Sequence, residues 1–260
     1  MFHQIAGMRL AIHTTILLCA AQIAGSGAHY RDDPAEPFFD PDSSVALWVD
    51  DFERSGEGSL DRYVTLGSEA IHLESGAGIG GSTAVRFDWT RSTDCRDESR
   101  LIEHAFPETP EVFLQFSVRY TRGFVFDWRG NGPCVGNAKK LFFLWSRSGS
   151  RFDVISENHA IGAGSDFDHP LFAQIGGALT PEALADGEWH RFTFHVRQSS
   201  TPTTADGFVY GWIDGKLKWA RTAVATNNSG GYYDFKLPTT FNQGSPATQS
   251  EWLDDLRIWR

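Results

Sequence analysis

Polar side chains recur at every second position in three segments of the sequence, residues 112–120, 189–197 and 208–213. The residues are Gln115, Arg119, Arg191, His195, Tyr210 and Trp212. Arginine guanidinium groups bind carboxylates in a forked geometry, and histidine and tyrosine side chains can exchange protons. Such a set could neutralise an anion, take a proton from carbon and return one to a leaving oxygen.

Period-two alternation predicts that these three segments are β-strands with one buried face. Successive side chains in a strand point to opposite faces, so a slip of one residue would expose a whole apolar row. Burial of each Phe side chain stabilises the fold by about 1.5–3 kcal/mol. We therefore expect the six polar residues to share one solvent-facing sheet surface. The alternatives are a solvated arginine surface, a surface histidine and two aromatics that only pack.

Further short segments also read as strands, and few stretches show a helical period. The strand segments are 84–89, 140–145, 216–220 and 252–259, and one helical turn or two is expected in 180–187. Asp214-Gly215 between two strands is a hairpin signal. Many short strands without crossover helices predict an all-β fold, an antiparallel β-sandwich of the jelly-roll kind.

The bulk composition fits one soluble domain with an acidic balance. The chain has 260 residues and a formal net charge of −10, without a run of Lys or Arg. All-β sandwiches of 200–250 residues commonly form one domain. The sequence lacks the basic run typical of nucleic-acid-binding proteins, so we expect no nucleic-acid partner. We also expect a monomer.

The N-terminal segment is typical of an export signal. An apolar run from Leu10 to Ala24 follows Arg9, and small residues up to Ala28 follow the run. The run is too short to span a membrane, so we predict a signal peptide at 1–28 and no transmembrane segment. A buried N-terminal helix is the alternative, and translation could start at Met1 or Met8. An arm or linker at 29–46 then precedes a domain at 47–260, in a secreted or periplasmic protein.

Two cysteines remain once Cys19 leaves with the signal. Cys95 and Cys134 both lie in polar, loop-like sequence. An even cysteine count in an exported protein predicts one disulfide between them, and two unpaired thiols are the alternative.

Two regions of the chain carry a family resemblance. The segment 186–196, DGEWHRFTFHV, is followed by 206–216, DGFVYGWIDGK. These segments resemble the paired strands of concanavalin A-like lectin and glucanase domains, and most of all secreted polysaccharide lyases of the heparin-lyase and alginate-lyase type. The terminal 252–259 and the early 48–53 resemble the last and first strands of the same sandwiches.

The resemblance implies a polysaccharide partner and two alternative functions. One is a lyase that cleaves a uronate-containing glycan by β-elimination, and the other is a non-catalytic carbohydrate-binding or adhesion domain. The E-x-D-x-E signature of the glucanases is not present, nor are the R-T/S-E, Q-I/V-H and Y-x-K-x-G-x-Y-x-Q blocks of alginate lyases. Because one fold hosts many functions, the site has to decide between the two.

For the lyase, each candidate residue is assigned a role. Arg119 or Arg191 would offset the uronate charge, and His195 or Tyr210 would transfer protons. The residues assigned to substrate binding are Gln115, Trp212, His104 from its own short strand, and Lys140 at the end of a Gly-rich loop. A surface histidine and a charged strand entrance are the alternatives for the last two.

Carboxylates cluster near both ends of the predicted domain. They are Asp51, Glu53, Asp254 and Asp255. Pairing of the first and last strands would bring them together, and hard oxygen ligands suit Ca²⁺. A structural calcium site is therefore predicted, and charges that keep an edge strand from pairing with another molecule are the alternative.

Overall fold

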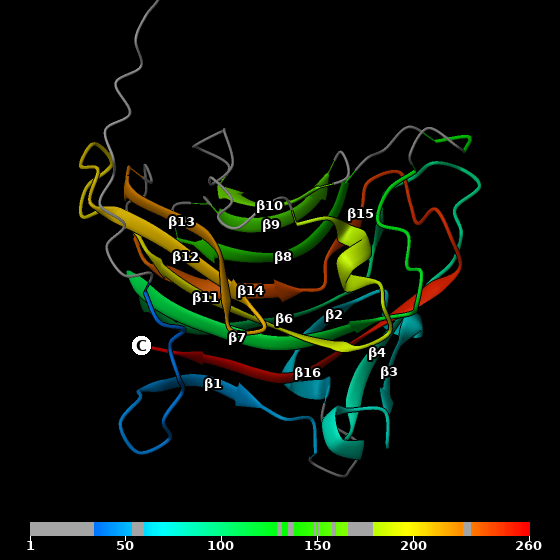
Figure 1. The fold of residues 1–260 in the computed structure, drawn as a ribbon, viewed down its shortest axis with the longest axis horizontal. Helices are drawn as coiled ribbons and strands as arrows, with labels where there is room; N and C mark the ends of the chain where they lie inside the picture. Colours follow the sequence, from blue (N-terminus) through cyan, green and yellow to red (C-terminus); the bar gives the residue numbers. More distant parts are fainter. Residues whose placement is uncertain are drawn as a thin grey trace, which may run out of the picture. The chain divides into compact units, whose positions relative to one another are not determined.

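The computed structural model describes residues 34–53, 60–128, 132–134, 138–147, 149, 151–157, 160–165, 179–225 and 230–260. Its regular elements are strands and 3₁₀ turns arranged in two antiparallel sheets, which confirms the predicted all-β sandwich (Figure 1). The predicted signal peptide lies outside the described residues. Among the described residues no helix is long and apolar enough to cross a membrane.

The first sheet, sheet A, contains most of the strands predicted to carry the polar face. Its strands in spatial order are β13 (Lys216–Val224), β12 (Gly207–Ile213), β11 (Trp189–Arg197), β7 (Glu111–Tyr120), β16 (Gln249–Trp259), β4 (Ala84–Trp89) and β3 (Ile71–Glu74). The first strand, β1 (Ala46–Asp50), pairs with the C-terminal part of β16, as the resemblance implied. Figure 1 shows β7 and β16 next to each other, with the C-terminus at the end of β16.

The second sheet, sheet B, supplies the opposite layer. Its strands in order are β10 (Ala160–Ser165), β9 (Arg151–Glu157), β8 (Ala138–Ser146), β14 (Tyr232–Leu237), β6 (Leu101–Thr109) and β2 (Val64–Leu66), with β15 (Thr240–Phe241) and β5 (Glu98–Ser99) paired at one end. The 3₁₀ turns are η1 (Leu60–Arg62), η2 (Ser68–Ala70), η3 (Ile79–Gly81) and η4 (Pro181–Leu184). The last of these is the short helical segment expected in 180–187.

The apolar rows of the two sheets pack against each other through phenylalanine rings. Phe116 of β7 and Phe192 of β11 stack at a centroid distance of 5.3 Å. Across the layers, Phe142 of β8 lies 5.7 Å from Phe116 and 5.0 Å from Phe194. These rings are almost completely buried. In each strand the apolar alternate side chains are buried, so the side chains between them point away from the core.

Two local features confirm further predictions. Asp214 and Gly215 have φ angles of 51° and 76°, as a tight turn with two left-handed residues requires between β12 and β13. Cys95 and Cys134 form a disulfide with a Cα–Cα distance of 5.4 Å. The bridge joins the loop before β5 to the loop before β8.

Candidate functional site

The predicted polar residues lie on one face of sheet A, the face turned away from the core. Thr193 of β11 stands opposite Gln115 on one side and Trp212 on the other. His195 stands opposite Tyr210, and Arg119 stands opposite Trp189. Cross-strand partners share a face, so parity alone placed the six residues correctly.

This outer face is not fully open to solvent, contrary to expectation. Gln115 is 7% exposed and Trp212 only 2%. Residues 34–40 of the N-terminal arm lie on this face, where the Trp212 indole donates a hydrogen bond to the Pro34 carbonyl at 3.1 Å. Farther along, Phe39 packs edge-on against Trp259 at 5.5 Å. The arm belongs to the folded body and covers part of the predicted surface.

The register separates the residues assigned to catalysis. Arg191 and His195 lie four positions apart on β11, which corresponds to about 13 Å along the strand. Tyr210 stands beside His195, so it is equally far from Arg191. Arg119 lies farther still, opposite Trp189. The backbone positions of Arg191 and His195 are therefore about 13 Å apart, and the catalytic roles of the predicted set stay a prediction.

His195 is held by its own neighbours. Its Nε2 lies 2.6 Å from a carboxylate oxygen of Glu111, and its ring stacks on Phe113 at 3.9 Å. Burial lowers the pKa of His195, and the hydrogen bond to the Glu111 carboxylate opposes that effect. The ring belongs to a row of aromatics that continues to Tyr210 on one side and Trp259 on the other. These contacts hold the His195 ring in place, and its proton-transfer role stays a prediction.

Arg119 lies between two tryptophans. Its guanidinium group is 4.5 Å from the Trp252 ring centroid and 5.0 Å from that of Trp189. Arg86 of β4 approaches Trp252 from the other side at 5.6 Å. Register places Arg86, Trp252, Arg119 and Trp189 side by side on four adjacent strands. Cations and flat rings therefore alternate across the outer face of sheet A.

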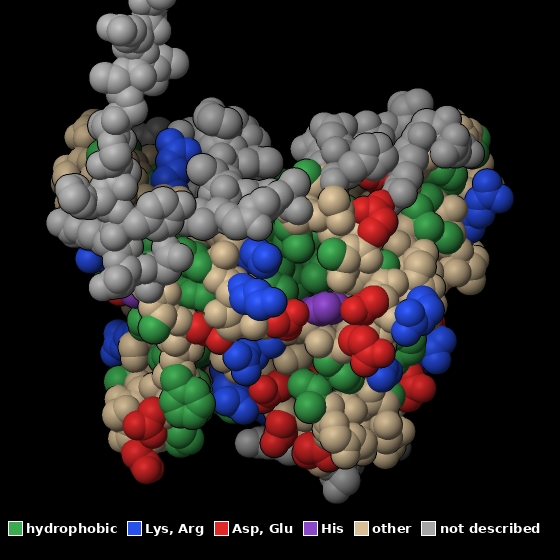
Figure 2. Space-filling view, in the orientation of Figure 1, with side chains coloured by type: hydrophobic (Ala, Val, Ile, Leu, Met, Phe, Trp, Pro, Cys, Tyr) green, Lys and Arg blue, Asp and Glu red, His purple; other side chains and the backbone are tan. Residues whose placement is uncertain are grey.

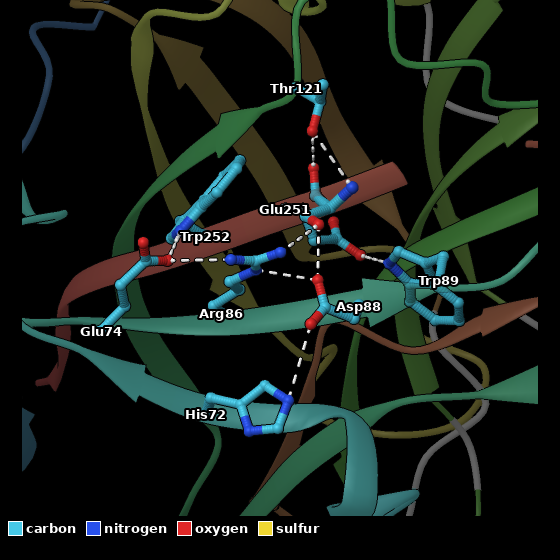
Figure 3. Close-up of polar contacts among 9 residues, drawn as sticks. His72, Glu74, Arg86, Asp88, Trp89, Thr121, Glu251 and Trp252 are labelled. Carbon is cyan, nitrogen blue, oxygen red and sulfur yellow. Dashed lines mark hydrogen bonds and ion pairs between the residues drawn. The ribbon is translucent and has the colours of Figure 1, made fainter. Parts of the chain in front are cut away.

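Carboxylates hold two members of this row, Arg86 and Trp252, in position (Figure 3). Trp252 donates its indole N–H to Glu74 at 2.7 Å, and Arg86 forms ion pairs with Glu74 and Asp88. Asp88 in turn lies 3.6 Å from His72. A hollow in the same face is lined by Ile79, Ser117, Trp189, Arg191, Asp214 and Asp255. On the side of the molecule that Figure 2 shows, acidic and basic side chains are interspersed.

Two residues assigned to substrate binding lie outside this face. His104 belongs to β6 in sheet B, stacks on Trp48 at 3.5 Å and contacts the Arg62 carbonyl through Nδ1 at 2.9 Å. Lys140 belongs to β8 in sheet B. The structure thus does not bring either residue together with Gln115 and Trp212.

The four carboxylates assigned to calcium lie near the β1–β16 pairing, but each is engaged locally. Asp254 accepts hydrogen bonds from the Ile79 amide and the Ser82 hydroxyl, both at 2.9 Å. Asp51 and Glu53 accept backbone amides, and Asp255 pairs with Arg257 at 2.6 Å. The described residues contain no group of three or more metal-ligating side chains. Calcium binding stays a prediction.

A second cluster, which sequence reasoning missed, lies on the outer face of sheet B. It is formed by the side chains of Glu103, Phe143, Trp145, Arg151, Asp153, Asp234 and Lys236, from four adjacent strands. Lys236 contacts Glu103 at 2.8 Å, and Arg151 contacts Asp153 at 3.0 Å. The Arg151 guanidinium lies 4.4 Å from the Phe143 ring and 5.5 Å from the Trp145 ring.

Asp234 is the buried carboxyl of this sheet B cluster. It is 4% exposed; Lys236 lies two residues on along β14, and Glu103 stands opposite Lys236 on β6. Burial and the nearby Glu103 carboxylate raise the pKa of Asp234 from 3.8 to about 7. A carboxyl that keeps its proton near neutral pH can act as a general acid.

Sequence could have indicated the sheet B cluster only in part. In segment 232–237, Asp234 and Lys236 alternate with Phe235 and Leu237, which is a strand pattern. The neighbouring strands come from distant parts of the chain, so the interaction of Asp234 with Glu103 leaves no local signal.

Comparison with protein-family models and with curated protein sequences finds no match. Solved structures do match in fold. The alginate lyase Aly36B is 11% identical with a TM-score of 0.59, and the match covers 84% of this chain and 97% of that one. An endo-β-1,4-glucuronan lyase from the fungus Trichoderma reesei is 14% identical with a TM-score of 0.54, covering 86% and 93%. Cellulose induced protein Cip1 is 12% identical with a TM-score of 0.56, covering 81% and 96%.

The resemblance to concanavalin A-like sandwiches is therefore confirmed at the level of the fold. The chain shares its architecture with alginate and glucuronan lyases. At this level of identity the likeness concerns the fold and leaves the activity to the residues of the site.

Proposed function

We propose that the protein is a secreted or periplasmic enzyme that cleaves a uronate-containing polysaccharide by β-elimination at the sheet B cluster. The observation that carries the proposal is the buried Asp234, with its raised pKa, beside Glu103 and Lys236. The shared fold with two kinds of polysaccharide lyase supports the substrate class. The disulfide fits an oxidising compartment.

The chemistry assigns one task to each group. Lys236 and Arg151 offset the charge of the uronate carboxylate, which makes the neighbouring carbon acid stronger. Glu103 accepts the proton from that carbon, and protonated Asp234 gives its proton to the leaving glycosidic oxygen. The C–O bond breaks as the C=C bond forms, so the products are a shortened chain and an unsaturated sugar. Trp145 provides a flat apolar surface beside these groups.

A second candidate function is glycan binding without catalysis on the outer face of sheet A. The alternating row of Arg86, Trp252, Arg119 and Trp189 favours it, because rings stack on sugars and guanidinium groups bind their oxygens. Such a surface could also feed a polysaccharide to an enzyme.

Incubation with alginate and glucuronan, with cellulose as the neutral control, tests the proposal. The ultraviolet absorbance of the unsaturated product should rise with at least one uronate polymer and stay flat with cellulose. Asp234→Asn should abolish the signal, whereas Asp61→Asn, at an exposed aspartate of η1, should leave it unchanged. Binding without any absorbance change would favour the second function.

A further inference from the structure

One carboxylate of the arm lies on the outer face of sheet A in the way a ligand would. Both oxygens of Glu36 contact Arg191, at 3.2 Å to Nε and 2.8 Å to Nη2. The Thr193 hydroxyl donates to the same carboxylate at 2.6 Å. A forked guanidinium with an adjacent hydroxyl is a specific geometry for a carboxylate.

An aromatic ring completes this corner. Thr193 and Trp212 stand opposite each other on β11 and β12, so the Trp212 ring lies next to the carboxylate position. Trp212 points away from the core and is nevertheless almost fully buried, because the arm covers it and accepts its N–H at Pro34. A cation, a hydroxyl and a flat ring together match a sugar that bears a carboxylate.

The corner is also continuous with an open part of the surface. Arg191 lines the hollow that contains Trp189, Asp214 and Asp255. Its side chain is 46% exposed even with Glu36 in place, whereas the Glu36 side chain is 16% exposed. A ligand in the hollow can therefore reach the guanidinium while the arm is still bound.

We propose that Arg191, Thr193 and Trp212 form a binding subsite for the carboxylate of an acidic sugar, and that Glu36 occupies this subsite when no ligand is bound. The choice of ligand class rests on the proposed function, but the subsite is on the opposite sheet from Asp234. Arm and ligand then compete, so the free protein binds the sugar more weakly than the subsite alone would.

Calorimetric titration with an alginate trisaccharide tests the proposal, and cellotriose is the uncharged control. Glu36→Gln removes the charge of the competitor and should tighten binding of the trisaccharide about fivefold or more. Asp42→Asn removes an equal charge from an exposed turn within the same arm and should bind like the wild type. Adding Arg191→Ala to Glu36→Gln should abolish the gain, with the fold checked by circular dichroism.

The outcomes separate this inference from the proposed enzyme function. Equal affinity of Glu36→Gln and wild type, or a gain that survives Arg191→Ala, would overturn the subsite, whatever the turnover at Asp234. A gain that depends on Arg191 supports the subsite even if the protein cleaves no polysaccharide. If the arm only fastens the fold, Glu36→Gln lowers the melting temperature without changing affinity, which also contradicts the proposal.

Discussion

The raised pKa of Asp234 makes a quantitative prediction about stability. The group titrates near pH 3.8 in the unfolded chain and near pH 7 in the folded protein. Below about pH 4 both states hold the proton, so it contributes no pH dependence. Between about pH 4 and 7 the unfolded chain releases the proton while the folded protein keeps it, so unfolding becomes more favourable as the pH rises.

The size of the effect follows from the shift. Each pKa unit corresponds to about 1.36 kcal/mol, so the wild type loses up to about 4 kcal/mol of stability at this site between about pH 4 and 8. Asp234→Asn cannot ionise and lacks this loss. The stability of the variant relative to the wild type should therefore increase steadily over this range.

Urea unfolding at a series of pH values measures the difference in unfolding free energy directly. Asp61→Asn is the control, because that aspartate is exposed. The difference in unfolding free energy between Asp61→Asn and wild type should not increase with pH. A pH-independent difference between Asp234→Asn and wild type would refute the environment described for Asp234, and with it the acid in the proposed reaction.

Three further outcomes are expected. Cys95→Ser opens a loop with a sequence separation of 39 and should cost about 4 kcal/mol in urea unfolding without reductant, whereas an unchanged midpoint would show that the bridge is not formed. Lys139→Met leaves the buried Glu251, 2.9 Å from the lysine, without its cation and should lower the free energy of unfolding by about 3–5 kcal/mol. Adding Glu251→Leu should restore part of the lost stability. An unchanged free energy of unfolding in Lys139→Met would contradict a charged pair. If Asp51, Glu53, Asp254 and Asp255 bind calcium, EDTA should lower the melting temperature, and no change would remove the calcium prediction.

The sequence predicted most of what depends on alternation within one strand. The bounds of β4 and β11 match the predicted segments, and Gln115, Thr193 and Trp212 share a face as parity requires. Burial of Phe116, Phe192 and Phe194 stabilises the fold enough to decide which alternate residues of each strand face the core, whatever the conformational preference of single residues. The hairpin at Asp214-Gly215 depended on turn chemistry, which is equally local.

Alternation within one strand does not show how far apart residues of different strands lie, or what covers them. Nothing local shows that Arg191 and Tyr210 lie about 13 Å apart, or that the arm buries Trp212. The pKa of Asp234 depends on burial and on Glu103 from another strand, so no motif carries it. His104 was assigned to the site because of its residue type, whereas the structure stacks it on Trp48.

Initial rates of unsaturated-product formation for two variants, one on each sheet, show directly which sheet carries the chemistry. We expect Asp234→Asn to lower the rate on a uronate polymer by about 100-fold or more, because a lost general acid costs that much. The double variant His195→Ala with Tyr210→Phe should retain most of the wild-type rate. Full activity of Asp234→Asn, with activity lost in the sheet A variant, would contradict the assignment of the chemistry to sheet B.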